Sequence, residues 1–279
     1  MKFGYLLVAA VAACGAPSAD NPGLTGNIPP DAGPPDAPRL SSATLYRFRS
    51  LGLADPHLWF GLGDVCIDVT DIVNNVATNV LQVDSSDPPD GTLDGSLAIA
   101  FRPLVTTPGS STAIDIEVPV CTAPARMSTC TATVETPKHA TTVVTHDSGN
   151  CLDVLPTTAA HPPEIPAAPC FASASQTLEV AFLGAAITLV DARGAASYDG
   201  NMLRPALIRG FLSLTDAEAL QFTINAFGIG TRSVASLLYG GGSCHDDQTK
   251  GDMDVGPDGQ PGWYVYLAFE AEKTPYIEK

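Results

Sequence analysis

Short runs in which apolar and polar residues alternate are the feature that most constrains how this sequence can fold. The clearest run is Gly262–Phe269, where the odd-numbered residues from Trp263 to Phe269 are large and apolar and would share one face of a strand. Five further runs are bounded by Gly, Pro, Asp or Ser, as strands commonly are. They are Leu97–Leu104, Ala113–Val120, Thr177–Leu183, Ala186–Asp191 and Ala206–Leu212. The sequence therefore predicts a mainly β fold, which we expect to be a β-sandwich-like arrangement with a few short α-helices.

Three segments carry helical signals instead. Apolar residues recur at helical spacing in about Thr70–Gln82, which predicts an amphipathic helix. These apolar residues are Val69, Ile72, Val73, Val76 and Val80. The phrase Thr215-Asp216-Ala217-Glu218 matches a capping box that would begin a second helix. The segment Ser233–Tyr239, which three glycines follow, predicts a third helix with a glycine stop.

Six cysteines lie beyond the first fourteen residues, and they predict a domain that is stapled by disulfides. They are Cys66, Cys121, Cys130, Cys151, Cys170 and Cys244. An even number of cysteines in an exported chain is typical of a disulfide framework, here of three bridges. Zinc is disfavoured because the chain has no Cys-x-x-Cys. The simplest pairing joins Cys121 to Cys130 and Cys151 to Cys170 across short segments, which leaves Cys66 with Cys244.

The N-terminus resembles a bacterial lipoprotein signal peptide. Lys2 precedes an apolar run from Phe3 to Val11, and Val11-Ala12-Ala13-Cys14 resembles a lipobox. The resemblance implies that residues 1–13 are removed and that Cys14 becomes the lipid-modified first residue. Gly15 follows, not Asp, which by the same resemblance favours the outer membrane. An ordinary secretory signal normally has a longer apolar core, and a transmembrane helix needs about 20 apolar residues.

Residues 14–39 form the next segment, the lipidated cysteine and a tether rich in Pro, Gly and Asp. Such a composition buries too little apolar surface to fold and favours extended polyproline II. At about 3.1 Å per residue, the 25 residues after Cys14 could hold a domain up to about 75 Å from the lipid. A proline-rich ligand for a partner domain is the alternative. Residues 40–279 then form a β-rich globular domain, and a division into two subdomains near 137–176 stays open.

The charge of the chain excludes some classes of function. The formal net charge is −16, and it becomes −17 when Lys2 leaves with the signal peptide. Such a surface repels phosphate backbones, so nucleic-acid binding is excluded and docking to membranes through basic residues is disfavoured. We expect the partners to be the membrane, through the N-terminal lipid, and a surface protein or glycan.

Two acidic clusters are candidate cation sites. The first is Asp84, Asp87, Asp90 and Asp94, where the spacing departs from a calcium loop and a solvated turn is the better interpretation. The second follows Cys244 and His245. Its carboxylates are Asp246, Asp247, Asp252, Asp254 and Asp258. Crowded carboxylates suit Ca²⁺, the one cofactor this sequence suggests, although the loop also departs from an EF-hand and could be an exposed loop pinned by a disulfide.

Motifs for catalysis are absent, so no catalytic residue is predicted. The chain has no Gly-x-Ser-x-Gly, no His-Glu-x-x-His and no phosphate-binding or dinucleotide-binding glycine motif. Asp55-Pro56-His57 near Trp59 could line a pocket, but a turn beside a packed aromatic ring is the favoured interpretation.

Several longer phrases resemble uncharacterised cell-surface lipoproteins of the myxobacterial kind. They are the lipobox, the GPPDAP tether, DGTLDGSLAIAFRPL, ITLVDARGAASYDG, LIRGFLSLTDAEA and GWYVYLAF. The resemblance implies an outer-membrane lipid anchor facing the periplasm or the cell surface, and it implies no activity. We therefore expect a non-catalytic binding or structural role at the cell surface. The alternative is a metal-dependent extracytoplasmic hydrolase that uses the Asp-rich loop near Cys244.

Overall fold

The structure is a computed structural model of the whole chain. It describes residues 43–62, 65–84, 86–90, 93, 96–104, 107–119, 121–122, 129–132, 138–153, 163–182, 185–224, 230–238 and 253–278. In these parts of the chain, neither helix has the length and apolar composition to cross a membrane.

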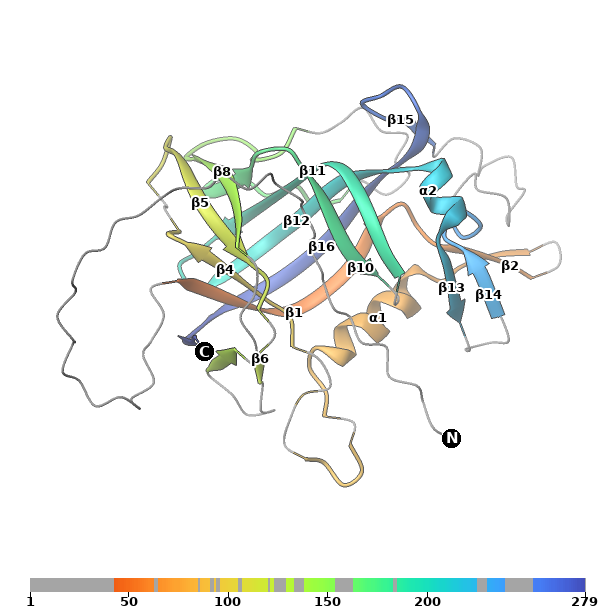
Figure 1. Cartoon of the computed structure of the whole chain (residues 1–279), viewed down its shortest axis with the longest axis horizontal. Coiled ribbons are helices and arrows are strands. Elements are labelled where there is room, and N and C mark those ends of the chain that lie inside the picture. Colours follow the sequence, from red (N-terminus) through yellow and green to blue (C-terminus); the bar gives the residue numbers. More distant parts are fainter. Residues whose placement is uncertain are drawn as a thin grey trace, which may run out of the picture.

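Eight antiparallel strands form a closed ring (Figure 1). In ring order they are β1 (Thr44–Asp55), β4 (Ala98–Arg102), β5 (Ser111–Glu117), β8 (His139–His146), β9 (Cys170–Ser173), β11 (Ala185–Tyr198), β12 (Met202–Ser213) and β16 (Pro261–Thr274). The last strand pairs with the first, for example Leu53 with Leu267. The expectation of a β-sandwich is therefore wrong, because the fold is a β-barrel.

Closure depends on β1, which the alternation pattern did not predict. This strand carries Arg47, Arg49 and Ser50 among its apolar residues, and its pairing shifts register between Phe48 and Ser50. A sandwich and a barrel both need strands with one apolar face, so alternation is the same in the two folds. What distinguishes them is the pairing of β1 with β4 on one edge and with β16 on the other.

The remaining strands attach to the ring or form small sheets beside it. They are β2 (Trp59–Leu62), β3 (Val65–Asp68), β6 (Cys121–Thr122), β7 (Cys130–Ala132), β10 (Gln176–Phe182), β13 (Gln221–Ile224), β14 (Gly230–Ser233), β15 (Asp254–Val255) and β17 (Tyr276–Ile277). The pair β2–β3 is a hairpin, β10 adds to β11, and β15 adds to β16. All six predicted runs overlap strands of the structure, and β8 and β9 pair within the same ring.

Side chains fill the inside of the ring. As predicted, Trp263, Val265, Leu267 and Phe269 of β16 share one face, and all four are buried in the interior. One half of the interior is rich in aromatic residues from β1, β4, β9 and β16. The other half is mainly aliphatic, although it includes Trp263, and it is covered by residues of α2 (Leu214–Ala219) and of the turn 234–238. An eight-stranded barrel has an interior that side chains can just fill, which is the case here.

Two helices are present in the described residues, and one predicted helix is wrong. The helix α1 (Thr70–Val80) is where the sequence predicts it. The helix α2 begins two residues earlier than expected, because its N-cap is Ser213, whose side chain accepts a hydrogen bond from the backbone N–H of Asp216. The predicted third helix is a turn that follows β14. Its single turn is closed by backbone bonds such as Leu237 N–H to Val234 O (3.0 Å), and Leu238 bridges to Leu58.

The helix α1 lies against β1 with its polar side. The side chain of Asn74 accepts a hydrogen bond from Leu53 N–H (2.7 Å) and donates one to Leu53 O (2.8 Å). Thr78 donates to Leu51 O (3.5 Å), and Gln82 donates to Arg49 O. These backbone groups belong to alternate residues and therefore point to the same edge of β1. The helix thus takes the place of a neighbouring strand where β4, which pairs with the start of β1, has ended.

This docking makes Asn74 a stability determinant, and its neighbour Asn75 is a natural control. We expect Asn74→Ala to lower the free energy of unfolding by about 1–2 kcal/mol, because two hydrogen bonds to a partly buried backbone are lost. Asn75 is exposed, so Asn75→Ala should change stability by less than about 0.5 kcal/mol. Urea unfolding followed by circular dichroism measures both, and equal effects would show that the contact with β1 contributes nothing.

The outside of the ring is covered at two places. The segment that contains Cys151 and Leu152 packs on Leu207 and Tyr266 of the outer wall. The predicted disulfide between Cys151 and Cys170 is confirmed, with the two Cα atoms 6.0 Å apart. Elsewhere, the small sheet β17–β7–β6 packs on β1 and β4.

Cys66 and Cys130 are also disulfide-bonded, so the four cysteines whose side chains the structure describes are all oxidised. The side chains of Cys121 and Cys244, which the other predicted pairings involve, lie outside the described residues.

Candidate interaction surface

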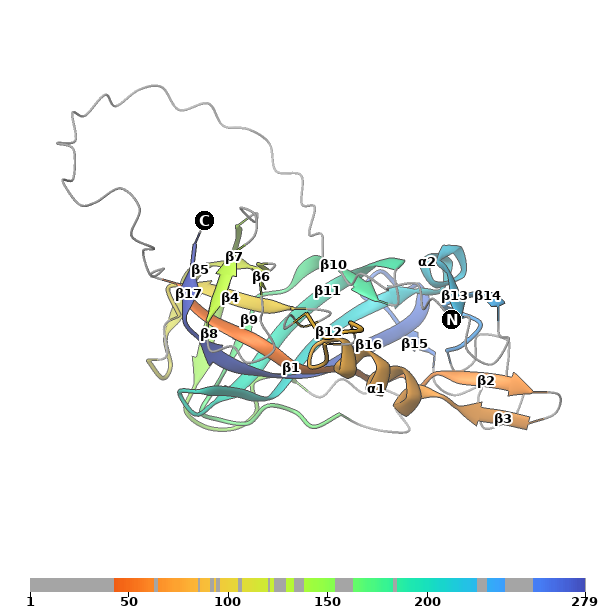
Figure 2. The ribbon, with the colours of Figure 1, turned by 90° about the horizontal axis from the view of Figure 1, so that it is seen from below.

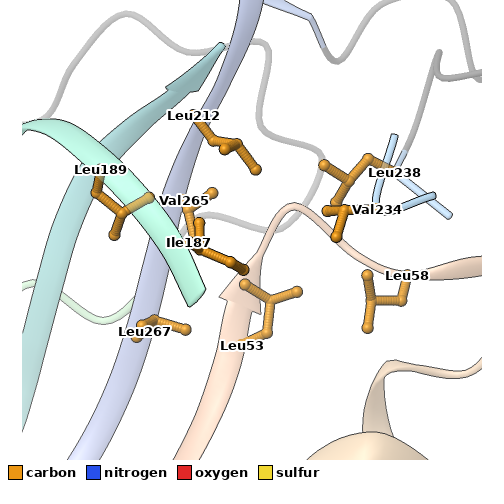
Figure 3. A pocket seen from close by; sticks show the side chains of 9 residues that line it. All are labelled: Leu53, Leu58, Ile187, Leu189, Leu212, Val234, Leu238, Val265 and Leu267. Atoms are coloured by element: carbon orange, nitrogen blue, oxygen red, sulfur yellow. The ribbon is translucent and has the colours of Figure 1, made fainter. Parts of the chain in front are cut away.

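The interior of the barrel contains a cavity of about 30 Å³ at its aliphatic end (Figure 3). Its nine lining side chains are all aliphatic and converge from four barrel strands, from the turn 234–238 and from Leu58. They are Leu53, Leu58, Ile187, Leu189, Leu212, Val234, Leu238, Val265 and Leu267. This volume is about that of one water molecule, and the lining offers no hydrogen-bond partner to hold one. The cavity is therefore a packing void with neither the size nor the chemistry of a substrate site.

A polar cluster lies on the outer wall around Arg209, which is 3% exposed. Its guanidinium donates to Asp153 O (3.1 Å), lies 3.8 Å from the carboxylate of Asp191 and is 5.9 Å from the ring centre of Tyr264. The pKa of the neighbouring Tyr266 is raised to about 12, chiefly by burial; Arg209 lowers it, and the carboxylates of Asp55 and Asp254 contribute to the rise. The bond to Asp153 attaches the disulfide-bonded segment to the barrel, so the arrangement has a structural role.

His57, which precedes β2, and Asp68, which ends β3, interact at the base of the β2–β3 hairpin. The imidazole Nδ1 lies 2.5 Å from a carboxylate oxygen of Asp68, and the other carboxylate oxygen accepts a hydrogen bond from Thr70 N–H (2.9 Å). Burial alone would raise the pKa of Asp68, but the hydrogen bonds from Thr70 and His57 outweigh it and hold this pKa below its usual value. The ring of His57 lies 6.5 Å from that of Trp59, as expected of a turn beside an aromatic residue.

The predicted metal site is described only in part. Asp254 accepts a hydrogen bond from Tyr264 N–H (3.0 Å), and Asp258 accepts one from Gln260 N–H (3.1 Å) in an exposed turn. Asp246, Asp247 and Asp252 lie outside the described residues. In the parts of the chain that the structure describes, no group of three or more His, Cys, Asp or Glu side chains could hold a metal ion. Calcium binding, and with it the hydrolase alternative, stays a prediction.

The first acidic cluster is also described in part. Asp84 accepts a hydrogen bond from Ser86 N–H (3.3 Å), and Asp87 and Asp90 are exposed. Asp94 lies outside the described residues. A carboxylate that bonds to the backbone two residues later is typical of a turn, which is the favoured interpretation of this segment.

Exposed aliphatic side chains gather on β3, on α1 and just after it. Eight large apolar residues are exposed in the described chain, and five of them lie between residues 65 and 83. We call these five residues the β3–α1 face: Val65, Ile67, Ile72, Val76 and Val83, each between 41% and 61% exposed. Figure 2 shows α1 and the β2–β3 hairpin following one another along one side of the molecule.

The orientation of α1 explains why this face is exposed. Because Thr70, Asn74 and Thr78 are used to contact β1 and Leu58, the apolar stripe of the helix is turned partly toward solvent. Val73 still packs on the aliphatic core, whereas Ile72 is 45% and Val76 57% exposed. Of the predicted apolar stripe, Val69 is therefore buried, whereas Ile72 and Val76 are exposed.

The sequence did contain a signal for this orientation. Thr70, Asn74 and Thr78 recur every four residues and form a second stripe of small polar side chains that can hydrogen-bond. An apolar stripe and a hydrogen-bonding stripe on one helix compete for the protein interior, and spacing alone does not decide between them.

The β3–α1 face is also low in charge. Asp68 and Asp71 are the only ionisable side chains between residues 67 and 83, and this stretch has no Lys or Arg. Asp71, Asn75 and Asn79 are exposed polar neighbours of the apolar residues on α1. In a chain with a net charge of −16, a stretch with so few charges could contact an apolar partner with little desolvation of charge.

Comparison of the chain with protein-family models, with curated proteins and with solved structures finds no significant match.

Proposed function

We propose that this protein is a lipid-anchored domain of the outer membrane with a non-catalytic binding role at the periplasmic or cell-surface side. The anchor in this proposal is Cys14 of the lipobox-like sequence, and residues 15–39 serve as a tether. The observation that carries the binding role is the β3–α1 face. Large apolar side chains that are exposed on neighbouring elements are candidates for an interaction site.

The interior of the barrel supports a role that depends on the outside of the molecule. The cavity at its aliphatic end has the volume of about one water molecule and an entirely aliphatic lining. Barrels that bind ligands inside keep a much larger pocket with a few polar groups that orient the ligand. Recognition on the outer surface is therefore the better supported role.

The anchor is tested by Cys14→Ser. Because the serine hydroxyl does not replace the acylated thiol, we expect the variant to lose its lipid and to leave the membrane fraction or to remain unprocessed. Membrane fractionation and the mass of the N-terminal peptide measure this. Ser18→Ala, four residues later, is the control and should fractionate with membranes as the unaltered chain does.

A second variant tests the membrane assignment. If the resemblance to lipoprotein signals holds, Gly15→Asp should move the protein from the outer to the inner membrane without loss of the lipid. Membrane association of Cys14→Ser, together with an unaltered N-terminal peptide free of acyl mass in the starting protein, would overturn the lipoprotein proposal.

A further inference from the structure

We propose that Arg47, on the outer wall of the barrel, binds a small inorganic anion such as chloride together with the hydroxyl group of Ser96. The site lies where β1 runs between β4 and β16 (Figure 1). It is separate from the β3–α1 face, and it depends neither on the lipid anchor nor on the binding role proposed above.

Arg47 is a buried charge without a counter-charge of its own. It is 4% exposed, and its buried Nε donates no hydrogen bond in the part of the chain that the structure describes. A guanidinium keeps its proton in proteins, so it cannot become neutral when it is buried. An unpaired charge in a protein interior is strongly unfavourable, and an anion that pairs with it relieves this cost.

The charges that act on Arg47 leave a net positive charge at this place. Glu272 pairs with Arg47 across β1 and β16, but its carboxylate accepts hydrogen bonds from Arg49 through Nε (2.7 Å) and Nη2. Burial lowers the pKa of Arg47, Arg49 lowers it further, and Glu272 opposes both. Two guanidinium groups thus share one carboxylate, so the site attracts one negative charge although the whole chain carries −16.

Ser96 supplies a second donor next to Arg47. Arg47 pairs with Ala98 of β4, and the pairing continues through a hydrogen bond from Phe48 N–H to Leu97 O (2.8 Å). Because side chains alternate along a strand, Ser96 and Ala98 share the outer side with Arg47. The hydroxyl of Ser96 is buried and has no hydrogen-bond partner among the described residues. A water molecule could accept from these donors, but only an anion also compensates the charge.

Arg209, the other buried arginine of the described chain, shows how a compensated site differs. Its Nε is also unused, but its guanidinium lies 3.8 Å from the carboxylate of Asp191 and donates to Asp153 O (3.1 Å). No described carboxylate forms such an ion pair with Arg47. Because both donors at the Arg47 site are buried, the site suits a single small ion and not a phosphate ester or a nucleotide.

The test compares thermal unfolding of the full chain in chloride and in gluconate, an anion too large for a buried site. The ionic strength is held constant, so general screening is the same in both. A ligand of the native state stabilises it by mass action. We therefore expect the Tm to rise by about 3 °C when chloride exceeds about ten times its Kd.

Three variants locate the effect. Arg47→Met should abolish the chloride shift without lowering the Tm in gluconate, because it removes an unpaired buried charge. Arg204→Met alters an arginine that is 58% exposed in another barrel strand, and it should retain the full shift. Ser96→Ala should raise the chloride concentration at the half-maximal shift severalfold, because one donor is lost.

A second measurement uses the unaltered chain and does not depend on the folding of a variant. Bromide replaces chloride and scatters X-rays anomalously. Crystals soaked in bromide should show an anomalous peak at hydrogen-bonding distance from the guanidinium of Arg47 and the hydroxyl of Ser96.

Three results would overturn the inference. The first is an equal Tm in chloride and gluconate, and the second is a chloride shift that Arg47→Met leaves unchanged. The third is a set of bromide peaks on exposed residues alone, which would mean an adventitious ion only. Failure of the proposed function is measured by the acyl mass at Cys14 and changes none of these results.

Discussion

Arg102→Met is expected to lower the free energy of unfolding by about 3 kcal/mol, because it leaves the buried carboxylate of Glu117 without its main partner. Glu117 is 3% exposed on the outer wall of β5. Arg102 of β4 donates to its two carboxylate oxygens through Nε (2.9 Å) and Nη2 (3.3 Å). The ammonium group of Lys138 lies 3.9 Å away and is half exposed, so it compensates in part.

The same arginine attaches the end of the chain to the barrel. Arg102 also donates to Glu278, which follows the strand β17. Burial raises the pKa of Tyr276 in that strand, and the carboxylate of Glu117 raises it further. We therefore expect Arg102→Met to increase the hydrogen exchange of β17 and its partner β7 before the rest of the barrel.

Arg204 is a matched control for Arg102. Both arginines lie in a barrel strand and are followed by a proline. Arg204, however, is 58% exposed, and its guanidinium lies 3.9 Å from the carboxylate of Asp199. Arg204→Met should cost less than about 1 kcal/mol, as exposed ion pairs usually do. The double variant Arg102→Met with Glu117→Met should recover much of the lost stability, because the uncompensated charge is removed. Equal losses for Arg102→Met and Arg204→Met in guanidinium unfolding would refute this account of the pair.

Gly262→Ala is the second substitution with a large expected effect. A Cβ at this position would lie 2.2 Å from the backbone oxygen of Leu212 and 2.6 Å from the ring of Phe211. Gly262 pairs with Ser213 where β12 and β16 meet, so the backbone oxygen cannot move away without breaking the pairing. We expect a loss of about 3 kcal/mol, the upper end of the usual range for overpacking.

Gly194→Ala separates this clash from the general effect of replacing glycine in a strand. A Cβ at Gly194 of β11 would come no closer than 3.9 Å to its nearest neighbour, the hydroxyl of Ser173. This variant should be neutral or more stable by about 0.5 kcal/mol, because alanine lowers the entropy of the unfolded chain. Thermal unfolding should therefore show a large decrease in stability for Gly262→Ala and no decrease for Gly194→Ala, and a destabilised Gly194→Ala would mean that β11 tolerates no side chain for another reason.

Local sequence patterns were sufficient to predict the elements whose environment stays the same along their length. The alternation in Gly262–Phe269 predicted both the strand β16 and its inner face, because one side of that strand is in the core along its length. The 3.6-residue period predicted the existence of α1. The close spacing of Cys151 and Cys170 predicted their disulfide. In each case the decisive neighbours are near in sequence.

The sequence did not show which contacts a segment would make when residues distant in sequence decide its conformation or orientation. The segment after Ser233 has helical spacing, yet burial of Val234 and Leu238 against the aliphatic core holds it as a turn. The stripe of Ile72 and Val76 is exposed because the backbone edge of β1 needs the polar side of α1. Unpaired backbone groups at a partly buried strand edge cost free energy, and Asn74 satisfies both backbone groups of Leu53.

The sequence by itself thus determined the strand-rich character of the protein, the inner face of its last barrel strand, the place of α1 and one disulfide. Only the tertiary structure decided that the strands close into a ring, since closure depends on Leu53 and Leu267 meeting from opposite ends of the chain. It also decided which side of α1 meets solvent. The physical reason is common to both. The spacing of apolar residues shows that a helix or strand has an apolar side, whereas long-range backbone pairing determines which other element covers that side.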